Sequence, residues 1–253
     1  MRISNVYQDL EARFHEPLWD EMAPDMEAEL ILKYLEKTSE PWLEIGSGNG
    51  RILKPIVRAG QVVEALEPSE SMLQASQEAL PECKHHLRTL EDFEWQPKAY
   101  GAILFTAFVG SLLEDLDASL AKAKHLLKSG GGLVMTQFVP WAELSGEAPA
   151  GKWYTDQRIP ANEQLTETLE LRTKHQIFRH SQRLIREHKY VLTDSKGKKI
   201  DSDHCQQNLR WYYYKELCEK LEKHGFKIER TVWDLSQEKI DEDAPVFTIF
   251  ASS

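Results

Sequence analysis

Cysteines and long hydrophobic runs are both scarce in this sequence of 253 residues. The three cysteines, Cys83, Cys205 and Cys218, form no Cys-x-x-Cys pair, which excludes a disulfide framework and a cysteine zinc site and suits a reducing compartment. No run approaches the roughly 18 apolar residues of a membrane-spanning helix, and the first ten residues lack the apolar stretch of a secretory signal. We therefore expect a cytoplasmic protein with no membrane partner.

Basic side chains are outnumbered, with 31 Lys and Arg against 41 Asp and Glu, so the formal net charge is −10. An acidic chain is poorly suited to holding a phosphate backbone, and we expect no nucleic-acid partner. We expect a monomer or a homodimer. The 41% of hydrophobic residues suffices for a globular core, and the length allows one large domain or a core of roughly 150 residues with about 100 to spare.

Short apolar runs alternate with helical patterns through the first half of the chain. The strands are expected at 42–45, 61–66, 86–90, 101–108 and 132–138, and the helices between them at 52–59, 69–79 and 113–127. Such alternation predicts a parallel sheet with crossover helices. Near the end of the chain, a helix at 215–224 and strands at 226–233 and 245–250 are expected to complete it.

The remaining segments carry different patterns. Residues 5–37 read as helical, with Leu10, Phe14, Leu18 and Met22 recurring at i+4 and Pro24 dividing two helices. Five prolines and glycines between 139 and 162 predict a long loop. Residues 164–192 and 207–213, around a hairpin turn at 196–199, predict an antiparallel meander.

A glycine-rich loop follows the first expected strand, with the sequence Glu44-Ile45-Gly46-Ser47-Gly48-Asn49-Gly50-Arg51. Glycines allow a sharp turn and a close approach to a ligand, and the following helix presents free N–H groups to anionic parts of that ligand. The dinucleotide fingerprint GxGxxG needs glycine where Arg51 stands. This spacing therefore disfavours a nicotinamide oxidoreductase.

The spacing E-x-G-x-G-x-G resembles motif I of the class I S-adenosylmethionine (SAM)-dependent methyltransferases. Three further stretches match the family in order: Glu64 to Leu73, Thr89 to Phe93, and Leu127-Lys128-Ser129-Gly130-Gly131-Gly132-Leu133. The resemblance implies an α/β fold with a Rossmann-like, mostly parallel seven-stranded sheet with helices on both faces, an antiparallel β lid and an N-terminal helical flap. The domain bounds it implies are 1–139 with 214–253 for the core and flap, and 140–213 for the lid, a substrate-recognition insertion.

The same resemblance implies SAM as cofactor and S-adenosylhomocysteine as product. The cofactor-binding residues that it indicates are Glu44, Gly46, Ser47, Gly48, Gly50, Glu67, Pro68, Met72, Leu90, Glu91, Phe105 and Thr106. Glu67 closes the second strand, and its two oxygens suit the two ribose hydroxyls.

No residue is marked as an unambiguous catalytic base. The candidates are His204, which follows Asp203, and Tyr7, because many similar enzymes carry a tyrosine on an N-terminal helix that closes over the cofactor. No metal is expected, because Thr106 and Gln137 stand where a metal-dependent enzyme would need acids.

Aromatic and basic side chains supply the candidates for the substrate site. Phe108, Trp141, Trp211 and Tyr213 are able to hold a ring or a cationic amine. Residues 171–190 carry six basic side chains against one acid, which is either a solvated strand face or a site where Arg179 and Arg183 hold a phosphate or carboxylate.

The sequence thus predicts a SAM-dependent methyltransferase acting at nitrogen or oxygen of a small molecule, similar to glycine and nucleotide-sugar N-methyltransferases. Methylation of RNA or protein is the alternative substrate class. A SAM-binding regulatory protein without catalysis is the alternative of a different kind, since no base is evident.

Overall fold

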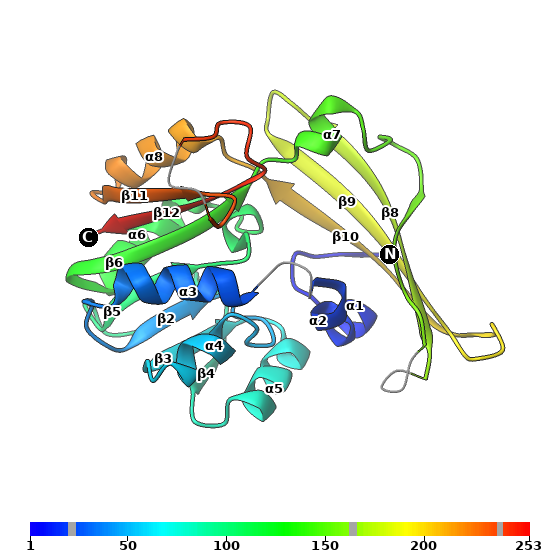
Figure 1. Ribbon diagram of the computed structural model, residues 1–253, viewed down its shortest axis with the longest axis horizontal. Helices are drawn as coiled ribbons and strands as arrows, with labels where there is room; N and C mark the ends of the chain where they lie inside the picture. The colour runs from blue at the N-terminus through cyan, green and yellow to red at the C-terminus, as the bar shows by residue number, and fades with distance from the viewer. Residues whose placement is uncertain (20–23, 162–165, 237–239) are drawn as a thin grey trace. The chain divides into compact units, whose positions relative to one another are not determined.

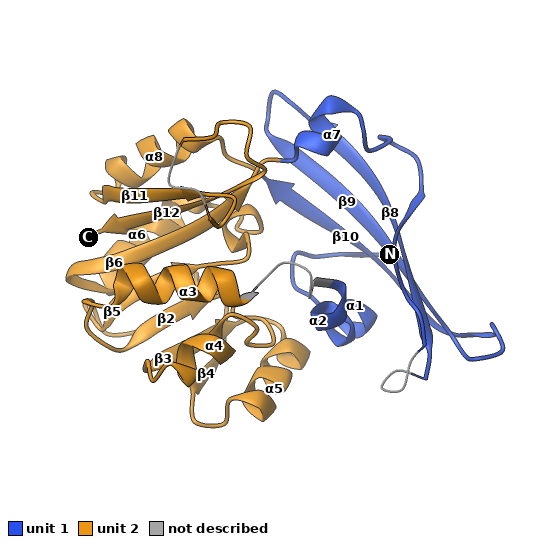
Figure 2. Cartoon of the chain, viewed as in Figure 1, with its two compact units in different colours: residues 1–22, 140–210 blue, residues 23–139, 211–253 orange. Residues whose placement is uncertain are grey.

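The computed structural model describes residues 1–19, 24–161, 166–236 and 240–253 (Figure 1). The chain divides into two compact units (Figure 2). Unit 1 comprises Met1–Met22 and Pro140–Arg210, and unit 2 comprises Ala23–Val139 and Trp211–Ser253. This division groups the N-terminal segment with the insertion, whereas the sequence motifs implied a flap attached to the core.

Unit 2 is built on a seven-stranded sheet in the order β11-β12-β6-β5-β2-β3-β4. Its strands are β2 (Trp42–Ile45), β3 (Val63–Glu67), β4 (Lys84–Leu87), β5 (Tyr100–Phe105), β6 (Leu127–Phe138), β11 (Lys227–Trp233) and β12 (Val246–Ser252). The pairings from β4 through to β6 are parallel, while β12 is antiparallel to both β6 and β11. The predicted mostly parallel seven-stranded sheet is confirmed.

In the described part of unit 2, this sheet is accompanied by α3 (Pro24–Leu35), α4 (Leu53–Arg58), α5 (Glu70–Ala79), the 3₁₀ turn η2 (Val109–Ser111), α6 (Leu116–Leu126) and α8 (Tyr214–Lys223). Ile31 of α3 and Ile56 of α4 pack in one apolar cluster with Trp42, Leu104 and other strand residues. Strands β2 and β5 are buried along their whole length, so both faces of the central sheet are covered, as expected for parallel strands.

A close approach of two backbone segments requires glycine at one position of β5. A Cβ on Gly101 would overlap the carbonyl of Ser39. The amide of Gly101 also donates to the carbonyl of Pro41 at 2.9 Å. The glycine is therefore required by the packing of the segment that leads into β2.

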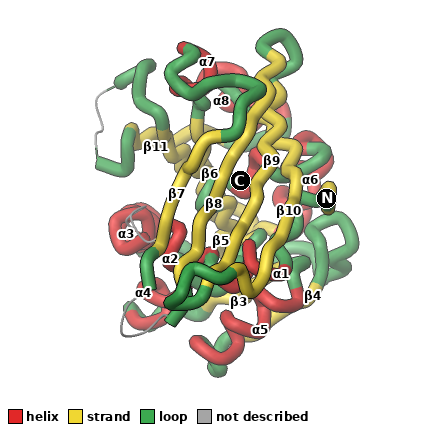
Figure 3. Tube along the Cα trace, turned by 90° about the vertical axis from the view of Figure 1, so that its right-hand side faces the viewer, coloured by secondary structure: helices red, strands yellow, loops and turns green. Residues whose placement is uncertain are grey.

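Unit 1 contains a five-stranded sheet in the order β1-β10-β9-β8-β7, which Figure 3 shows face-on over β7 to β10. Its strands are β1 (Arg2–Ile3), β7 (Tyr154–Ile159), β8 (Thr168–Phe178), β9 (Arg183–Thr193) and β10 (Lys199–Arg210). All pairings are antiparallel except that of β1 with β10. The antiparallel meander is confirmed, although residues 162–165 lie outside the described residues.

Among its described residues, the same unit contains the short helices α1 (Asp9–Arg13), α2 (His15–Trp19) and α7 (Trp141–Ser145). The predicted i+4 stripe provides the contact with the sheet, because Leu10, Phe14 and Leu18 pack in one buried cluster with Leu169, Leu171, Tyr190, Leu192 and Cys205. Met22, the fourth member of that stripe, lies outside the described residues. None of the described helices of the chain is long and apolar enough to cross a membrane.

The predicted long loop at 139–162 is wrong, since it contains α7 and β7. Of the prolines and glycines that suggested a loop, Pro149 and Gly151 lie in the connection between these elements, and the other three stand at their ends. Pro140 is the N-cap of α7 and Gly146 its C-cap with φ 86°, while Pro160 directly follows β7. Prolines and glycines end helices and strands, but a short helix or strand can still form between two of them.

Several strand boundaries also differ from the expectation. For example, β5 ends at Phe105 instead of residue 108, and β6 begins at Leu127 instead of residue 132. The strand expected at 86–90 is β4 at Lys84–Leu87, and the extended stretch expected to reach 213 ends with β10 at Arg210. Tyr213 is the N-cap of α8, so the aromatic run after Arg210 leads into a helix.

Candidate functional site

The glycine-rich loop directly follows β2 and has a conformation that requires glycine. Gly46, Gly48 and Gly50 have φ angles of 65°, 56° and 79°. The amide of Gly46 donates to the carbonyl of Leu66 at 2.7 Å, and a Cβ on Gly46 would overlap a methyl group of Val109. The loop is thus held tightly against the end of β3 and the start of η2.

Glu67 ends β3 beneath this loop. Its two oxygens accept hydrogen bonds from the backbone amides of Gly48 and Ser69, each at 2.8 Å. The residue is buried, and burial raises the pKa of its carboxyl group, although both amide bonds oppose that rise. A carboxylate held by two amides has a fixed orientation and keeps lone pairs for further donors.

Glu44, inside β2, is a second buried carboxyl group. Thr106 Oγ1 donates to its Oε1, whereas Oε2 has no hydrogen-bond partner among the described residues. Burial raises the pKa of Glu44 to about 8, against the lowering effect of the Thr106 hydrogen bond. Sequence reasoning identified both Glu44 and Thr106, and the structure brings these two side chains into contact.

Glu27, on α3, is a third buried carboxyl group, which sequence reasoning missed. The backbone amide of Ala107 donates to its Oε1 at 3.4 Å, and burial raises its pKa. The positive charge of Arg51 lowers the pKa of both Glu27 and Glu44, so the three groups lie within electrostatic range. Glu27 sits in an ordinary amphipathic helix, and no local sequence pattern distinguishes it.

The other predicted cofactor residues have varied environments. Met72 Cε would lie 3.1 Å from a Cβ on Gly48, so this side chain adjoins the loop. Ser47, Gly50, Leu90, Phe105 and Thr106 are buried, Pro68 is partly buried, and Glu91 is exposed. In the part of the chain that the structure describes, no three His, Cys, Asp or Glu side chains gather as metal ligands.

The predicted substrate and catalytic residues are distributed over both units. In unit 2, Phe108 has a left-handed backbone and packs edge-on against Phe138, at 5.2 Å between ring centroids. Trp211 is fully buried and Tyr213 is 40% exposed. In unit 1, Trp141 begins α7.

The inner face of the unit 1 sheet is the one on which Leu10, Phe14 and Leu18 pack. Arg183 and His204 lie on the opposite, outer face, and Arg179 lies in the turn after β8. Arg179 donates to the carbonyl of Leu144 at 2.6 Å. Arg183 is exposed while the next residue, Leu184, is buried, so Arg183 belongs to the outer face. The ring of His204 packs edge-on against Trp153, at 5.8 Å between centroids, which also places His204 on that face, opposite buried Cys205.

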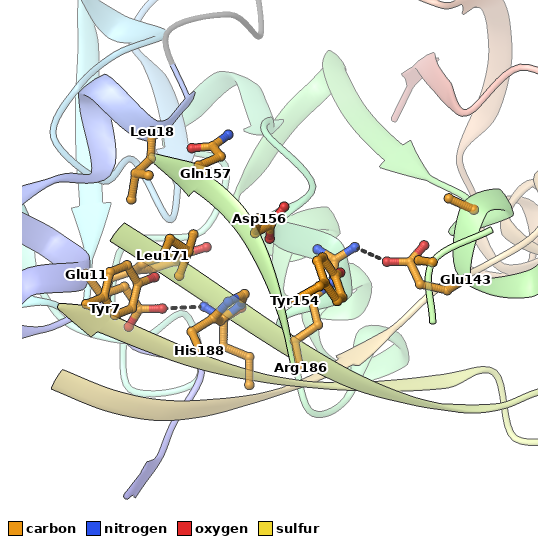
Figure 4. A pocket seen from close by; sticks show the side chains of 14 residues that line it. Tyr7, Glu11, Leu18, Glu143, Tyr154, Asp156, Gln157, Leu171, Arg186 and His188 are labelled. Atoms are coloured by element: carbon orange, nitrogen blue, oxygen red, sulfur yellow. Dashed lines mark hydrogen bonds and ion pairs between the residues drawn. The ribbon is translucent and has the colours of Figure 1, made fainter. Parts of the chain in front are cut away.

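A pocket of about 450 Å³ lies on the inner face of the unit 1 sheet (Figure 4). Of the predicted site residues, Tyr7 alone is among the described residues that line it. The full lining is Tyr7, Glu11, Leu18, Ala142, Glu143, Ala148, Tyr154, Asp156, Gln157, Leu171, Arg186, His188, Tyr190 and Gln207. It therefore combines α1, α2 and α7 with four strands of one sheet.

A hydrogen-bonded series of side chains crosses this face. Thr173 Oγ1 donates to Asp156 Oδ2 at 2.7 Å and lies 2.9 Å from His188 Nδ1. The Gln207 side chain hydrogen-bonds His188 and donates through Nε2 to Glu11 Oε1 at 2.8 Å. The series thus links β7, β8, β9, β10 and α1.

The charges in the pocket are mostly paired. Glu11 Oε2 accepts from Arg2 at 3.0 Å, and Glu143 Oε1 accepts from Arg186 at 2.7 Å. Burial raises the pKa of Glu11 to about 7, although Arg2 opposes this. Burial, together with the charge of Arg186, lowers the pKa of His188 to about 3, so this ring is neutral at physiological pH.

Residues 43–133 match the family model described as a methyltransferase domain. No curated protein matches the chain in sequence. Among solved structures, a sugar N-methyltransferase, KedS8 from Streptoalloteichus, is 18% identical with a TM-score of 0.74, covering 96% of this chain and 95% of that one. The amino pentose methyltransferase CalS10 from Micromonospora echinaspora, bound to SAM, is 16% identical with a TM-score of 0.71, covering 98% and 100%.

A third similar structure is a SAM-dependent methyltransferase from Clostridium acetobutylicum, at 13% identity and TM-score 0.73, with 90% of this chain and 89% of that one covered. Residues 43–133 therefore resemble a methyltransferase domain, and the chain has the fold of the class I SAM-dependent methyltransferases.

Proposed function

We propose that this chain, with its methyltransferase domain of the class I SAM-dependent fold, transfers a methyl group from SAM to nitrogen or oxygen of a small molecule. The observation that carries the proposal is the glycine loop above the buried Glu67 carboxylate, beside a group of buried polar atoms that lack partners. Similarity to sugar N-methyltransferases in fold supports a small-molecule substrate.

The residues of unit 2 fit SAM chemically. Among the described residues, Glu44 Oε2, Ser47 Oγ, Arg51 Nη1 and Gln137 Nε2 are buried without hydrogen-bond partners. Unpaired buried polar groups are costly and call for an occupant that satisfies them. SAM carries an ammonium, a carboxylate and ribose hydroxyls, which suit Glu44, Arg51 and Glu67 respectively.

When bound, SAM supplies a methyl group already activated by the positive charge on sulfur. The task of the protein is then to bind and orient the reactants, because methyl transfer is an in-line displacement at carbon. Glu67 and the glycine loop fix the cofactor, and the pocket of unit 1 binds the methyl acceptor. An acceptor amine needs only to lose its proton before attack, so its methylation does not require a strong catalytic base.

The decisive experiment combines binding and turnover. Thermal unfolding is measured with SAM, S-adenosylhomocysteine and NAD, because a ligand of the native state raises the melting temperature. SAM and S-adenosylhomocysteine should raise it in the wild-type protein but not in Glu67→Ala. Stabilisation by NAD alone would overturn the cofactor assignment.

Turnover is then followed by mass spectrometry of a metabolite extract incubated with the enzyme and SAM. A metabolite that gains the mass of one methylene is expected with the wild-type protein and not with Glu67→Ala. SAM binding without any methylated product would favour a non-catalytic SAM-binding protein. A labelled methyl group found in RNA or protein would replace the small-molecule assignment.

A further inference from the structure

The pocket of unit 1 is lined by more acid than base. Three carboxyl groups, from Glu11, Glu143 and Asp156, and one guanidinium group, from Arg186, face it. Arg2 binds Glu11 but does not line the pocket. Burial raises the pKa of Glu11 to about 7, so Glu11 is only partly ionised at neutral pH. Among the described lining residues, the carboxylates of Glu143 and Asp156 then stand against the guanidinium of Arg186, and the neutral His188 adds no positive charge.

Asp156 is the carboxylate placed to receive a ligand. It is exposed, and its Oδ2 accepts from Thr173 at 2.7 Å. No described residue hydrogen-bonds to its Oδ1. Glu11 and Glu143 differ, because each is almost fully buried and already paired with an arginine.

The orientation of Asp156 is set by buried groups. Thr173 is 1% exposed and His188 is 8% exposed, and the two side chains are hydrogen-bonded to each other. A carboxylate whose partners are fixed by packing is preorganised, so a ligand does not have to order it on binding.

The remaining walls suit the body of a small organic cation. The rings of Tyr7, Tyr154 and Tyr190 line the pocket, and aromatic faces attract ammonium groups. Leu18 and Leu171 add apolar surface. A volume of about 450 Å³ lies within the usual range for small-molecule sites.

We propose that this pocket binds a small amine in its protonated form, with the Asp156 carboxylate facing the ammonium group. The inference rests on the proposed function in taking this amine to be the methyl acceptor, which loses its ammonium proton to solvent at the exposed Asp156 before its nitrogen lone pair attacks the methyl group. An anionic ligand is disfavoured, because Arg186 is already paired with Glu143 at 2.7 Å and Arg2 with Glu11 at 3.0 Å.

The test compares amines with alcohols of matched shape: ethanolamine with ethylene glycol, benzylamine with benzyl alcohol, and D-glucosamine with D-glucose. Binding is followed by NMR titration of the His188 and tyrosine ring resonances in the full chain, with S-adenosylhomocysteine present. We expect at least one amine to bind at least about tenfold more tightly than its alcohol, the difference that one charge-assisted hydrogen bond provides. Equal binding within every pair, or no saturable amine binding up to about 50 mM, would overturn the inference.

Two variants of Asp156 and one control sharpen the result. Asp156→Asn keeps an oxygen for Thr173 but loses the charge, and it should weaken the binding of the preferred amine about tenfold or more. Asp156→Glu keeps the charge and should retain the preference for the amine. Glu187→Gln removes a carboxylate that pairs with Lys174 at 2.6 Å outside the pocket lining. This control should leave the binding of the amine and of its matched alcohol unchanged.

The SAM affinity of each variant, measured by calorimetry, shows whether cofactor binding is intact, and methyl transfer then separates the two proposals. If the wild-type protein shows no selectivity for amines but transfers a methyl group to a neutral acceptor, the pocket inference alone is wrong. If the amine binds through Asp156 but no methyl group is transferred to any acceptor, the proposed function is wrong and the binding site remains.

Discussion

The hydroxyl of Thr173 and the ring of His188 form a hydrogen bond of 2.9 Å whose direction is fixed by a third residue. Thr173 has one hydroxyl proton, and it donates that proton to the Asp156 carboxylate. Thr173 therefore accepts from His188, so Nδ1 of His188 carries the proton.

The first prediction is that His188 stays neutral, as the Nδ1–H tautomer, across the physiological range. Burial lowers its pKa to about 3, so the ring gains a second proton only in strong acid. Nitrogen-15 NMR of the histidine rings should show one protonated and one unprotonated nitrogen from pH 5 to pH 8. A titration midpoint near the ordinary value of about 6.5 would contradict the prediction.

The second prediction concerns the hydroxyl of Thr173. In Thr173→Val, the His188 Nδ1–H group loses its acceptor within a buried site, which should cost about 1–3 kcal/mol of the free energy of unfolding in urea. Thr173→Ser keeps the hydroxyl, and its free energy of unfolding should stay much closer to that of the wild-type protein. Similar losses for both variants would mean that packing of the Thr173 methyl group, rather than the hydrogen bond, stabilises this site.

The third prediction is a pH dependence due to Glu44. Its pKa is raised from 4.5 to about 8 in the folded protein, so the folded state binds more protons than the unfolded state between these values. The stability that Glu44 contributes is therefore present in full below about pH 4.5 and is lost as the pH rises through 8. Relative to Glu44→Gln, which does not titrate, wild-type protein without SAM should become progressively less stable from pH 5 to pH 9. Parallel stability curves for the two proteins would refute this.

The fourth prediction separates backbone strain from steric overlap by comparing a glycine of the glycine loop with a glycine outside it. Gly46 and Gly60 both have positive φ angles, of 65° and 91°, but a Cβ meets Val109 at Gly46 and open space at Gly60. Gly60→Ala should cost about 1–2 kcal/mol for the backbone conformation alone. Gly46→Ala should cost at least about 1 kcal/mol more, because Val109 must move, and should also weaken SAM binding. Equal costs in thermal unfolding would show that Val109 adapts freely.

The strands and helices around the glycine loop were predictable because their signals are local. The turn at Gly46, the acid at Glu67 and the alternation of strands with helices are each readable within a short stretch of sequence. Glu27 gives no such signal, since its role depends on α3 bringing it to Ala107 and within range of Arg51.

The unit 1 pocket was not predictable, because strand register decides which side chains share a face. Thr173 pairs with His188, and one residue of slip would turn the opposite set of side chains inward. The basic run from 171 to 190 shows the same effect. Arg186 lines the pocket, whereas Arg183 belongs to the outer face, so the run is not one patch.

The pairing of Arg2 with Cys205 has a consequence for biosynthesis. On the ribosome, the chain grows by about 5–20 residues per second, so the roughly two hundred residues between these positions take about 10–40 seconds to emerge. Throughout that interval Leu10 and Phe14 have no β10 to cover them. Holdase chaperones recognise such exposed apolar segments, and the first twenty residues are their expected point of engagement on the nascent chain.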